Sequence, residues 1–180
     1  MRALALLMLV GASLFAESIP ANNIKRSLLE SIEKNIDRRL DLLGLDDPFL
    51  ILGQTRGVYL DGYGAVFTTE LNLIASANLS PFRPSYTKEE LQRIHQKKVT
   101  RLVALKKNMR DLLVNAAATL DTVPMDEKIA LGITLFYFNW EDHTGLPKQV
   151  LMVAPKRALL SALKGENTEL DAALKIQDIN

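Results

Sequence analysis

Residues 57–76, GVYLDGYGAVFTTELNLIAS, show the clearest structural pattern in the chain. Polar and apolar side chains alternate after residue 62, which is typical of a half-buried β-strand. Asp61-Gly62 is a strong turn signal, and Gly64 adds a second flexible position. We predict a β-hairpin with its turn near residues 61–64; alternatively, Gly64 marks a bulge in one longer strand. One face of the predicted strand comprises Tyr63, Ala65, Phe67, Thr69, Leu71 and Leu73, and the other comprises Val66, Thr68, Glu70 and Asn72.

Amphipathic helices are predicted on both sides of this hairpin. In residues 23–43, apolar side chains recur at steps of three and four, which favours a helix with one buried face. A longer helix is predicted at residues 88–120, because Thr87 and Glu90 form a capping box. Its basic stretch, with a local charge of +5, fits phosphates, anionic lipids or an acidic partner. We interpret it as a solvated surface, because the basic residues surround the helix.

A second hairpin is predicted near the C-terminal end. Residues 129–140, IALGITLFYFNW, are apolar on both faces, which indicates a central strand covered on both sides. Residues 141–145 form the expected turn, residues 149–154 the partner strand, and residues 156–163 a helix that starts at Pro155. The sequence therefore predicts an α+β fold in the order α-ββ-α-ββ-α. Two antiparallel hairpins would form one sheet, packed against a long central helix and flanking helices.

The first eighteen residues, MRALALLMLVGASLFAES, have the pattern of a secretory signal peptide. Arg2 is the only charge before Glu17, and the apolar run between them is shorter than the roughly 20 residues of a membrane span. We predict cleavage between Ala12 and Ser18, which places the mature protein in the periplasm or outside the cell. The alternatives are an uncleaved N-terminal anchor and an amphipathic start to the first helix.

The rest of the chain has the composition of an ordinary globular domain. We predict a signal peptide at residues 1–18, a single α+β domain at 19–165 and a polar C-terminal tail at 166–180 with a net charge of −3. The net charge of +1 argues against a dedicated nucleic-acid binder. The absence of cysteine excludes disulfides. No second apolar segment is long enough to span a membrane, so the mature chain is expected to lack a span.

Two segments of the chain resemble an uncharacterised family of exported bacterial proteins. They are VYLDGYGAVFTTELNL (58–73) and, after a basic helix, IALGITLFYFNWEDHTGLPKQVLMVAPKRALLSAL (129–163). In that family a Tyr-Leu-x-Gly-Tyr-Gly-x-x-Phe segment precedes a long helix and a second hairpin. The resemblance covers about residues 20–165 and implies an exported bacterial domain. It implies no activity, cofactor or functional residue.

Patterns that indicate catalysis are weak. The two histidines, His95 and His143, lack the spacing of a metal site, and no serine lies in a Gly-x-Ser-x-Gly segment. We therefore expect no catalytic residue, metal or cofactor. Gly62-Tyr63-Gly64 is not a phosphate-binding loop, but glycines in a hairpin allow a ligand or another backbone to approach closely. This hairpin is the first candidate for a functional surface.

Lys98 falls in the middle of the apolar stripe of the predicted long helix. A lysine there must extend its ammonium group to solvent, find a partner or shift its pKa. Glu70, in the middle of a predicted strand, is a candidate partner. We interpret Lys98 as structural, with a functional Lys98–Glu70 pair as the alternative.

Three classes of function fit the sequence, of which we favour the first. It is a non-enzymatic exported domain that contacts an unknown envelope protein, or acts as an envelope accessory factor. This hypothesis predicts an exposed apolar patch or an uncovered edge strand. The second class is a binder of a small ligand, lipid or peptide between sheet and helices. It predicts an apolar pocket near Tyr59, Tyr63 and Trp140.

The third class is a hydrolase, which requires two of Asp61, Glu70 and His143 to converge within hydrogen-bonding reach. The candidate surface for a ligand or partner comprises all the residues singled out for these hypotheses. They are Tyr59, Asp61, Tyr63, Glu70, Lys98, Trp140 and His143.

Overall fold

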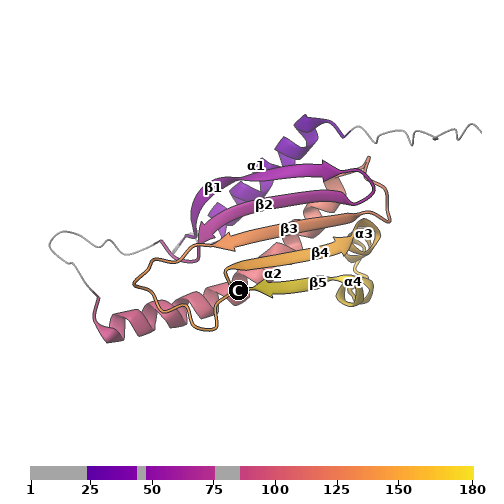
Figure 1. Cartoon of the computed structure of the whole chain (residues 1–180). Coiled ribbons are helices and arrows are strands. Elements are labelled where there is room, and N and C mark those ends of the chain that lie inside the picture. The colour runs from indigo at the N-terminus through magenta and orange to yellow at the C-terminus, as the bar shows by residue number, and fades with distance from the viewer. Residues whose placement is uncertain (1–23, 44–47, 76–85) are drawn as a thin grey trace, which may run out of the picture.

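The fold is α+β, with helices on one side of a five-stranded sheet (Figure 1). The computed structural model describes residues 24–43, 48–75 and 86–180, so the predicted signal peptide at 1–18 lies outside the described residues. The elements are α1 (Arg26–Leu42), β1 (Leu50–Leu60), β2 (Gly64–Asn72), α2 (Lys88–Thr119), β3 (Lys128–Leu135), β4 (Gln149–Pro155), α3 (Lys156–Leu163), α4 (Asn167–Ala173) and β5 (Lys175–Ile179).

The order of the strands in the sheet follows their order in the chain, from β1 at one edge to β5 at the other. β1 and β2 form the predicted antiparallel hairpin, and the pairs β3–β4 and β4–β5 are also antiparallel. β2 and β3 are parallel, and α2 is the crossover between them. The α+β class is confirmed, while the sheet differs from two antiparallel hairpins because it is mixed and has a fifth strand.

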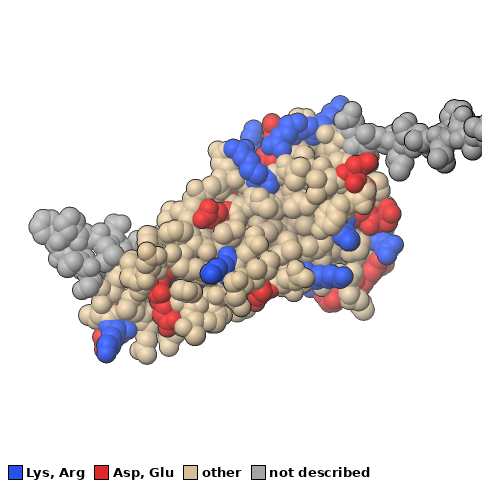
Figure 2. All heavy atoms as spheres, in the orientation of Figure 1, with Lys and Arg blue, Asp and Glu red and all other residues tan. Residues whose placement is uncertain are grey.

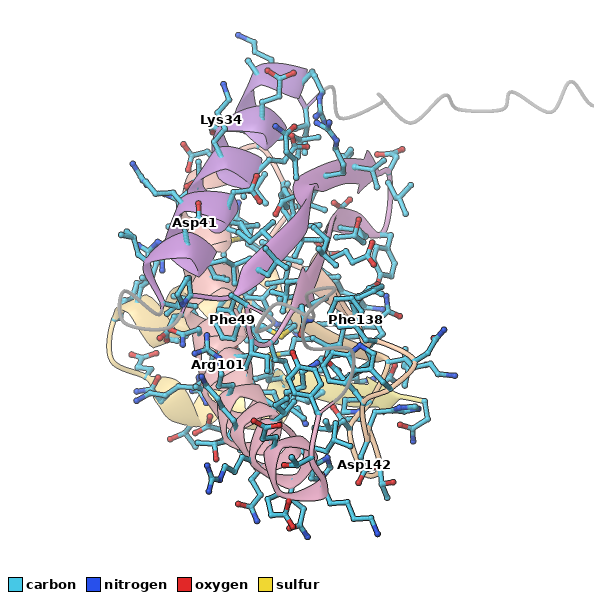
Figure 3. All side chains as sticks on the ribbon, turned by 90° about the vertical axis from the view of Figure 1, so that its left-hand side faces the viewer. Lys34, Asp41, Phe49, Arg101, Phe138 and Asp142 are labelled. Atoms are coloured by element: carbon cyan, nitrogen blue, oxygen red, sulfur yellow. The ribbon has the colours of Figure 1, made fainter. Side chains whose placement is uncertain are left out.

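The core lies between the sheet and the helices. Phe67, Leu131 and Met152 are cross-strand neighbours on β2, β3 and β4, and all three are buried. Leu105 and Met109 of α2 lie in the same buried cluster. The alternation predicted for β2 is therefore confirmed, as is the capping box of Thr87 and Glu90 at the start of α2. Figure 3 gives a view turned by 90°, in which α1 and α2 again lie to one side of the strands.

β3 differs from its prediction in length and in surroundings. It ends at Leu135 instead of Trp140, and Phe136 donates a last backbone hydrogen bond to Leu71 of β2. β3 is central, as expected, but its two faces are not both covered by helices (Figure 1). Ala130 and Gly132, on the face away from the helices, are buried although no described helix covers them. These residues are so small that the side chains of neighbouring strands shield them.

Residues 166–180, expected to form a polar tail, instead form α4 and β5. Leu170 of α4 is fully buried, and β5 pairs with the open edge of β4. Asp178 of β5 accepts from Lys106 of α2 at 2.6 Å, and Asp171 of α4 pairs with Arg110. The basic stretch of α2 thus meets the acidic C-terminal segment of its own chain.

Side chains of α1 bind the backbone of β1 at the edge of the sheet. Glu33 is buried; it accepts from the backbone N–H of Gly57 at 2.6 Å and from Arg26 through both carboxylate oxygens. Asp37 accepts from the backbone N–H of Thr55 at 3.0 Å. β1 is irregular between Gly53 and residue 56, where its register with β2 shifts. The two carboxylates therefore satisfy N–H groups of an edge strand that bulges.

We expect Glu33→Ala to lower the free energy of unfolding by about 2–3 kcal/mol, because a buried N–H and Arg26 lose their acceptor. Urea unfolding measures the loss. Glu30→Ala is the matched control, since Glu30 pairs with the same Arg26 at 3.3 Å in an exposed position. That variant should lose less than about 0.5 kcal/mol. Equal losses in both variants would show that Glu33 does not anchor β1.

Candidate functional site

The predicted site residues separate into groups that lie far apart. Asp61 and Tyr63 lie in the turn between β1 and β2, and Tyr59 lies just before it. Trp140 and His143 lie in the β3–β4 loop (residues 136–148), at the opposite end of β3. Eight residues of strand separate the two ends by about 26 Å. The three aromatic residues expected around one pocket are therefore at opposite ends of the sheet.

At the turn end, Glu127 accepts two hydrogen bonds from the β1–β2 hairpin. Its Oε1 lies 3.1 Å from the hydroxyl of Tyr59 and 3.2 Å from the backbone nitrogen of Gly62. The neighbouring Lys128 places its ammonium group 5.1 Å from the centre of the Tyr63 ring. Glu127 is buried, so its carboxylate joins the hairpin to the start of β3, whereas Lys128 is exposed.

The conformation of Gly64 and its close neighbour explain why this position of the hairpin requires glycine. Its φ is +125°, and a Cβ at this position would overlap the backbone carbonyl of Lys128. The close approach predicted for this hairpin does occur, and the approaching backbone belongs to the chain itself. We therefore read Gly64 as the junction where β2 and β3 begin to pair.

At the loop end, Lys98 and Glu141 form a buried ion pair. Lys98 is 0% exposed, and its ammonium group also lies 4.8 Å from the centre of the Tyr137 ring. Burial lowers the pKa of Lys98, and the carboxylate of Glu141 partly opposes that shift. Lys98 lies on the apolar face of α2, as predicted, and of the expected outcomes it has a partner, which is Glu141 and not Glu70. Glu70 is exposed and alternates with Thr69 and Leu71, which face the core.

Aromatic rings surround Trp140 in the β3–β4 loop. Trp140 stacks on Phe138 at 5.3 Å and contacts Tyr86 at 4.5 Å between ring centres. Phe138 in turn contacts Phe136 edge to face at 5.0 Å. These ring contacts stabilise the conformation of the loop around Trp140, which remains half-buried.

Both histidines of the chain are found at the β3–β4 loop: His143 belongs to it, and His95 of α2 contacts it. His143 is exposed and stacks on Tyr137 at 5.5 Å, and Nδ1 of His95 lies 3.0 Å from the backbone oxygen of Asp142. The three residues of the hydrolase hypothesis do not converge, because Asp61 lies at the other end of the sheet and Glu70 on its outward face. Within the described ranges, no three histidine or acidic side chains are grouped to bind a metal ion.

Tyr137 gives the loop a pH dependence that can be measured. Burial and the negative charge of Glu141 raise the pKa of Tyr137 above its ordinary value of 10.0, and its hydroxyl donates to Pro147 at 2.8 Å. A raised pKa in the folded state stabilises the fold below pH 10 and loses that effect as the pH rises further.

We expect Tyr137→Phe to be less stable than the wild type by about 1 kcal/mol at neutral pH, since a hydrogen bond is lost. Above pH 10 the difference in the free energy of unfolding should shrink. The folded state opposes ionisation of Tyr137, so the wild type loses stability as the pH rises, whereas the phenylalanine variant has no such group. Urea unfolding from neutral pH to pH 11 measures this. A difference that stays constant with pH would contradict the assignment.

The surface opposite the helices is formed by outward side chains of the sheet, and we call it the open face. It comprises two cross-strand rows: Val58, Val66, Ala130 and Val153; and Arg56, Thr68, Gly132 and Leu151. No described helix lies over it (Figure 1). Figure 2 shows this side in the same orientation: its middle is largely uncharged, and charged side chains gather at the edge formed by α1 and β1 and around α3 and α4. Of the residues proposed from the sequence, only Glu70 belongs to this side of the sheet.

The sequence does not predict the open face, because apolar residues on both faces of β3 are typical of a strand covered on both sides. The outward residues of β3 are Ala130, Gly132 and Thr134, and their apolar or small character suggested a second covering layer. Val58, at 50% exposed, shows that no such layer is present over β1 among the described residues. The size of the outward residues is the signal that was available: a packed layer needs larger side chains to fill it.

A groove of about 310 Å³ lies on the other side of the molecule, between α1 and α2. Asn35 and Asn115 line it above a floor that includes Ile36 and Leu112. Among its described lining residues none is charged, so the groove has no group to select a charged ligand.

Membrane spans and relatives complete the description. Among the described helices, none is both long and apolar enough to cross a bilayer, since α2 has the length but carries charged residues from Lys88 to Asp111. No family model, curated protein or solved structure matches this chain, so a function has to be argued from the geometry above.

Proposed function

We propose that this chain is an exported, non-enzymatic interaction domain that binds a protein surface through the open face. The observation that supports this most directly is the one-sided placement of the helices (Figure 1). A sheet with one solvated face normally alternates apolar and polar side chains. Here Val58, Val66, Leu151 and Val153 are on the solvated side. Contiguous apolar surface of this kind marks interaction sites.

The chemistry of the open face favours a protein over a charged polymer. Its basic side chains, Arg56, Lys128 and Lys175, are separated from one another, and Glu70 lies among them. A surface for nucleic acid or anionic lipid concentrates one sign of charge. A flat aliphatic surface with isolated charges matches the core and rim of a protein interface.

The non-enzymatic part of the proposal rests on side-chain positions. Asp61, Glu70 and His143 are separated, and the buried carboxylates Glu33, Glu127 and Glu141 each contact groups of their own fold. A general acid–base pair has to share a cleft with its substrate. Buried carboxylates that already bind backbone or lysine groups serve the fold instead.

Export is proposed from residues 1–18 and fits the resemblance to exported bacterial proteins. Cell fractionation followed by N-terminal sequencing of the mature protein tests it. We expect the protein in the envelope or periplasmic fraction, with a first residue between 13 and 19. A chain that retains Met1 and fractionates with the cytosol would contradict export.

Binding through the open face is tested with a variant on each side of the molecule. Leu151→Asp places a charge on the open face, and Val103→Asp places one at an exposed position of α2 on the helix side. Immobilised wild type and Val103→Asp should retain the same envelope protein from an extract, and Leu151→Asp should lose it. Retention by all three proteins would exclude the open face as the binding surface.

A further inference from the structure

We propose that the exposed edge of β5 binds an extended, acidic segment of another protein, which adds to the sheet as one more strand. This edge is a different surface from the open face, so the inference goes beyond the proposed function. The segment is recognised by its backbone, by apolar side chains that face α2 and by its negative charge.

The two edges of the sheet differ in how their backbone groups are satisfied. At the β1 edge, Glu33 and Asp37 of α1 accept from the backbone N–H groups of Gly57 and Thr55. At the other edge, the five residues of β5, Lys175–Ile179, are all exposed, and no described strand pairs with its outer side (Figure 1). An uncovered edge strand without proline is a template for another strand.

The register of the sheet identifies the free backbone groups of β5. Leu135 donates its N–H to the oxygen of Lys148, its register partner, so odd residues of β3 and even residues of β4 hydrogen-bond to each other. The odd residues of β4 therefore face β5, where they pair with the odd residues of 175–179. The N–H and C=O groups of Ile176 and Asp178 are left pointing outward.

Beside this edge, α2 presents an apolar flank. Lys106 of α2 donates to Asp178 at 2.6 Å, so this side of the helix faces the edge of β5. Val99 lies two helical turns before Lys106 on the same side, and Val103 one turn after Val99; they are 43% and 68% exposed. Ile176, on the helix side of β5, is 50% exposed. Every second side chain of a strand added beside β5 would face these three apolar residues.

Figure 1 shows how α2 comes to lie beside the edge. Its N-terminal half runs on past the end of β5, clear of the strands. The helix layer therefore extends further than the sheet layer at this edge. One more strand would continue the sheet over the flank that α2 leaves exposed.

The charges around the edge favour an acidic segment. Three exposed lysines border it, and none has an acidic partner among the residues that the structure describes: Lys107, Lys148 and Lys175. The backbone N–H of Lys148 donates to the oxygen of Ile179 at 2.8 Å, which places Lys148 at the opposite end of β5 from Lys175. Asp178, in contrast, is already paired with Lys106. Carboxylates of an added strand would therefore meet unpaired positive charge at both ends of β5.

These features together describe recognition by strand addition, in which main-chain hydrogen bonds give affinity and side-chain contacts give specificity. The outward groups of Ile176 and Asp178 provide the hydrogen bonds. The Val99–Val103 flank and the three lysines select apolar and acidic side chains. Because the edge is short, we expect weak binding, with a dissociation constant of about 10–100 µM.

A phage-displayed library of random peptides of about eight residues tests this inference, since a strand with its flanks has that length. We expect the immobilised wild type to enrich peptides in which apolar and acidic side chains alternate. A fluorescein-labelled synthetic copy of one such peptide should bind in the range of about 10–100 µM, measured by fluorescence anisotropy. Lysine in place of its acidic residues should weaken binding at least tenfold. If the wild type enriches no such peptide, the inference is overturned.

Two substitutions at Ile176 separate the backbone contribution from that of the side chain. Ile176→Pro removes the outward N–H and leaves the hydrogen bonds to β4 intact, because proline is tolerated on the outer side of an edge strand. It should weaken peptide binding at least tenfold. Ile176→Ala keeps the N–H and loses most of the side chain, and its affinity should stay within about threefold of the wild type. Equal affinities of the two variants would overturn strand addition.

Amide hydrogen exchange of the wild type keeps the test decisive if Ile176→Pro loses its fold. In the free protein, the amides of Ile176 and Asp178 should exchange faster than those of the odd residues of 175–179, which are bonded to β4. The peptide should slow exchange at Ile176 and Asp178, and unchanged rates there would overturn the inference. Slower exchange at these amides on raising the concentration of the protein alone would show that a second copy occupies the edge, which would overturn the proposed partner.

Failure of this inference can be told apart from failure of the proposed function, because each surface has its own variant. If Val103→Asp loses the envelope protein and Leu151→Asp retains it, the open face is wrong and the β5 edge is the binding surface. If Leu151→Asp alone loses it and the wild type enriches no acidic peptide, the β5 edge is wrong and the open face stands.

Discussion

Lys98→Met is expected to lower the free energy of unfolding by about 3–5 kcal/mol, because it leaves a charge buried without its partner. Glu141 is 6% exposed, and its Oε1 has no hydrogen-bond partner even with Lys98 in place. Removal of the ammonium group takes away its counter-charge. The carboxylate must then take up a proton or draw the β3–β4 loop away from α2.

A double-mutant cycle measures the interaction free energy between Lys98 and Glu141 apart from the other contacts of each residue. Lys98→Met with Glu141→Leu removes both charges, and this variant should recover most of the stability that Lys98→Met loses. Lys106→Met is the exposed control, because Lys106 pairs with Asp178 at 2.6 Å near solvent and should cost less than about 1 kcal/mol. Urea unfolding of the four proteins measures these differences. The assignment fails if Lys98→Met costs no more than Lys106→Met.

Gly64→Ala is expected to be the most damaging single methyl group in the sheet, at about 4 kcal/mol or more. Two penalties combine at this position: a φ of +125°, which alanine adopts with strain, and overlap of the new Cβ with the backbone carbonyl of Lys128. Lys128 cannot yield, because its N–H donates to the backbone oxygen of Tyr63 at 2.8 Å. The start of β3 would have to separate from β2.

Alanine substitutions at two other glycines separate the cost of the strained φ from the cost of the overlap. Gly62→Ala has strain without overlap, since φ is +75° and nothing lies within 4 Å of its Cβ, and should cost about 1 kcal/mol. Gly53→Ala has neither penalty and should be neutral or slightly stabilising. Urea unfolding, or circular dichroism if the variant is unfolded in buffer, gives the order. A Gly64→Ala protein as stable as Gly62→Ala would show that β2 and β3 do not meet as described.

Local patterns predicted much of the fold, because the interactions that create them are local. The capping box of Thr87 and Glu90 involves groups three residues apart, and the alternation from Ala65 to Leu73 needs only the geometry of one strand. The helix at 156–163 is likewise predicted from Pro155 at its start, and the structure has it at those residues. These elements required no knowledge of what packs against them.

The sequence does not identify the partner of Lys98, and the reason is different. Glu141 is 43 residues away, in a loop whose position depends on β3 ending at Leu135. Glu70 was nevertheless a poor candidate from the sequence itself. Thr69 and Leu71 fall on the more apolar face of the predicted strand, and alternation puts Glu70 on the other face, away from the core and the helices. A consistent use of that rule would have excluded it.

The C-terminal strand and the open face depend on the number of layers and strands in the whole molecule. Residues 175–179, KIQDI, have little β-strand character, and they pair because β4 offers an open edge. The apolar outward residues of β3 equally fit a sheet between two layers of helices. No local sequence pattern indicates that every described helix lies on the same side of the sheet.

The order of the strands has a consequence for how this molecule acquires its structure. Because spatial order equals chain order, the sheet can grow one strand at a time as the polypeptide emerges, each new strand adding to the one before. β2 and β3 form the one pairing between consecutive strands that must close a long segment, and α2 shortens that distance as it forms. Short sequence separations of this kind are associated with fast folding. β5 follows the other four strands in the chain, so it can complete this edge of the sheet only once β4 is in place.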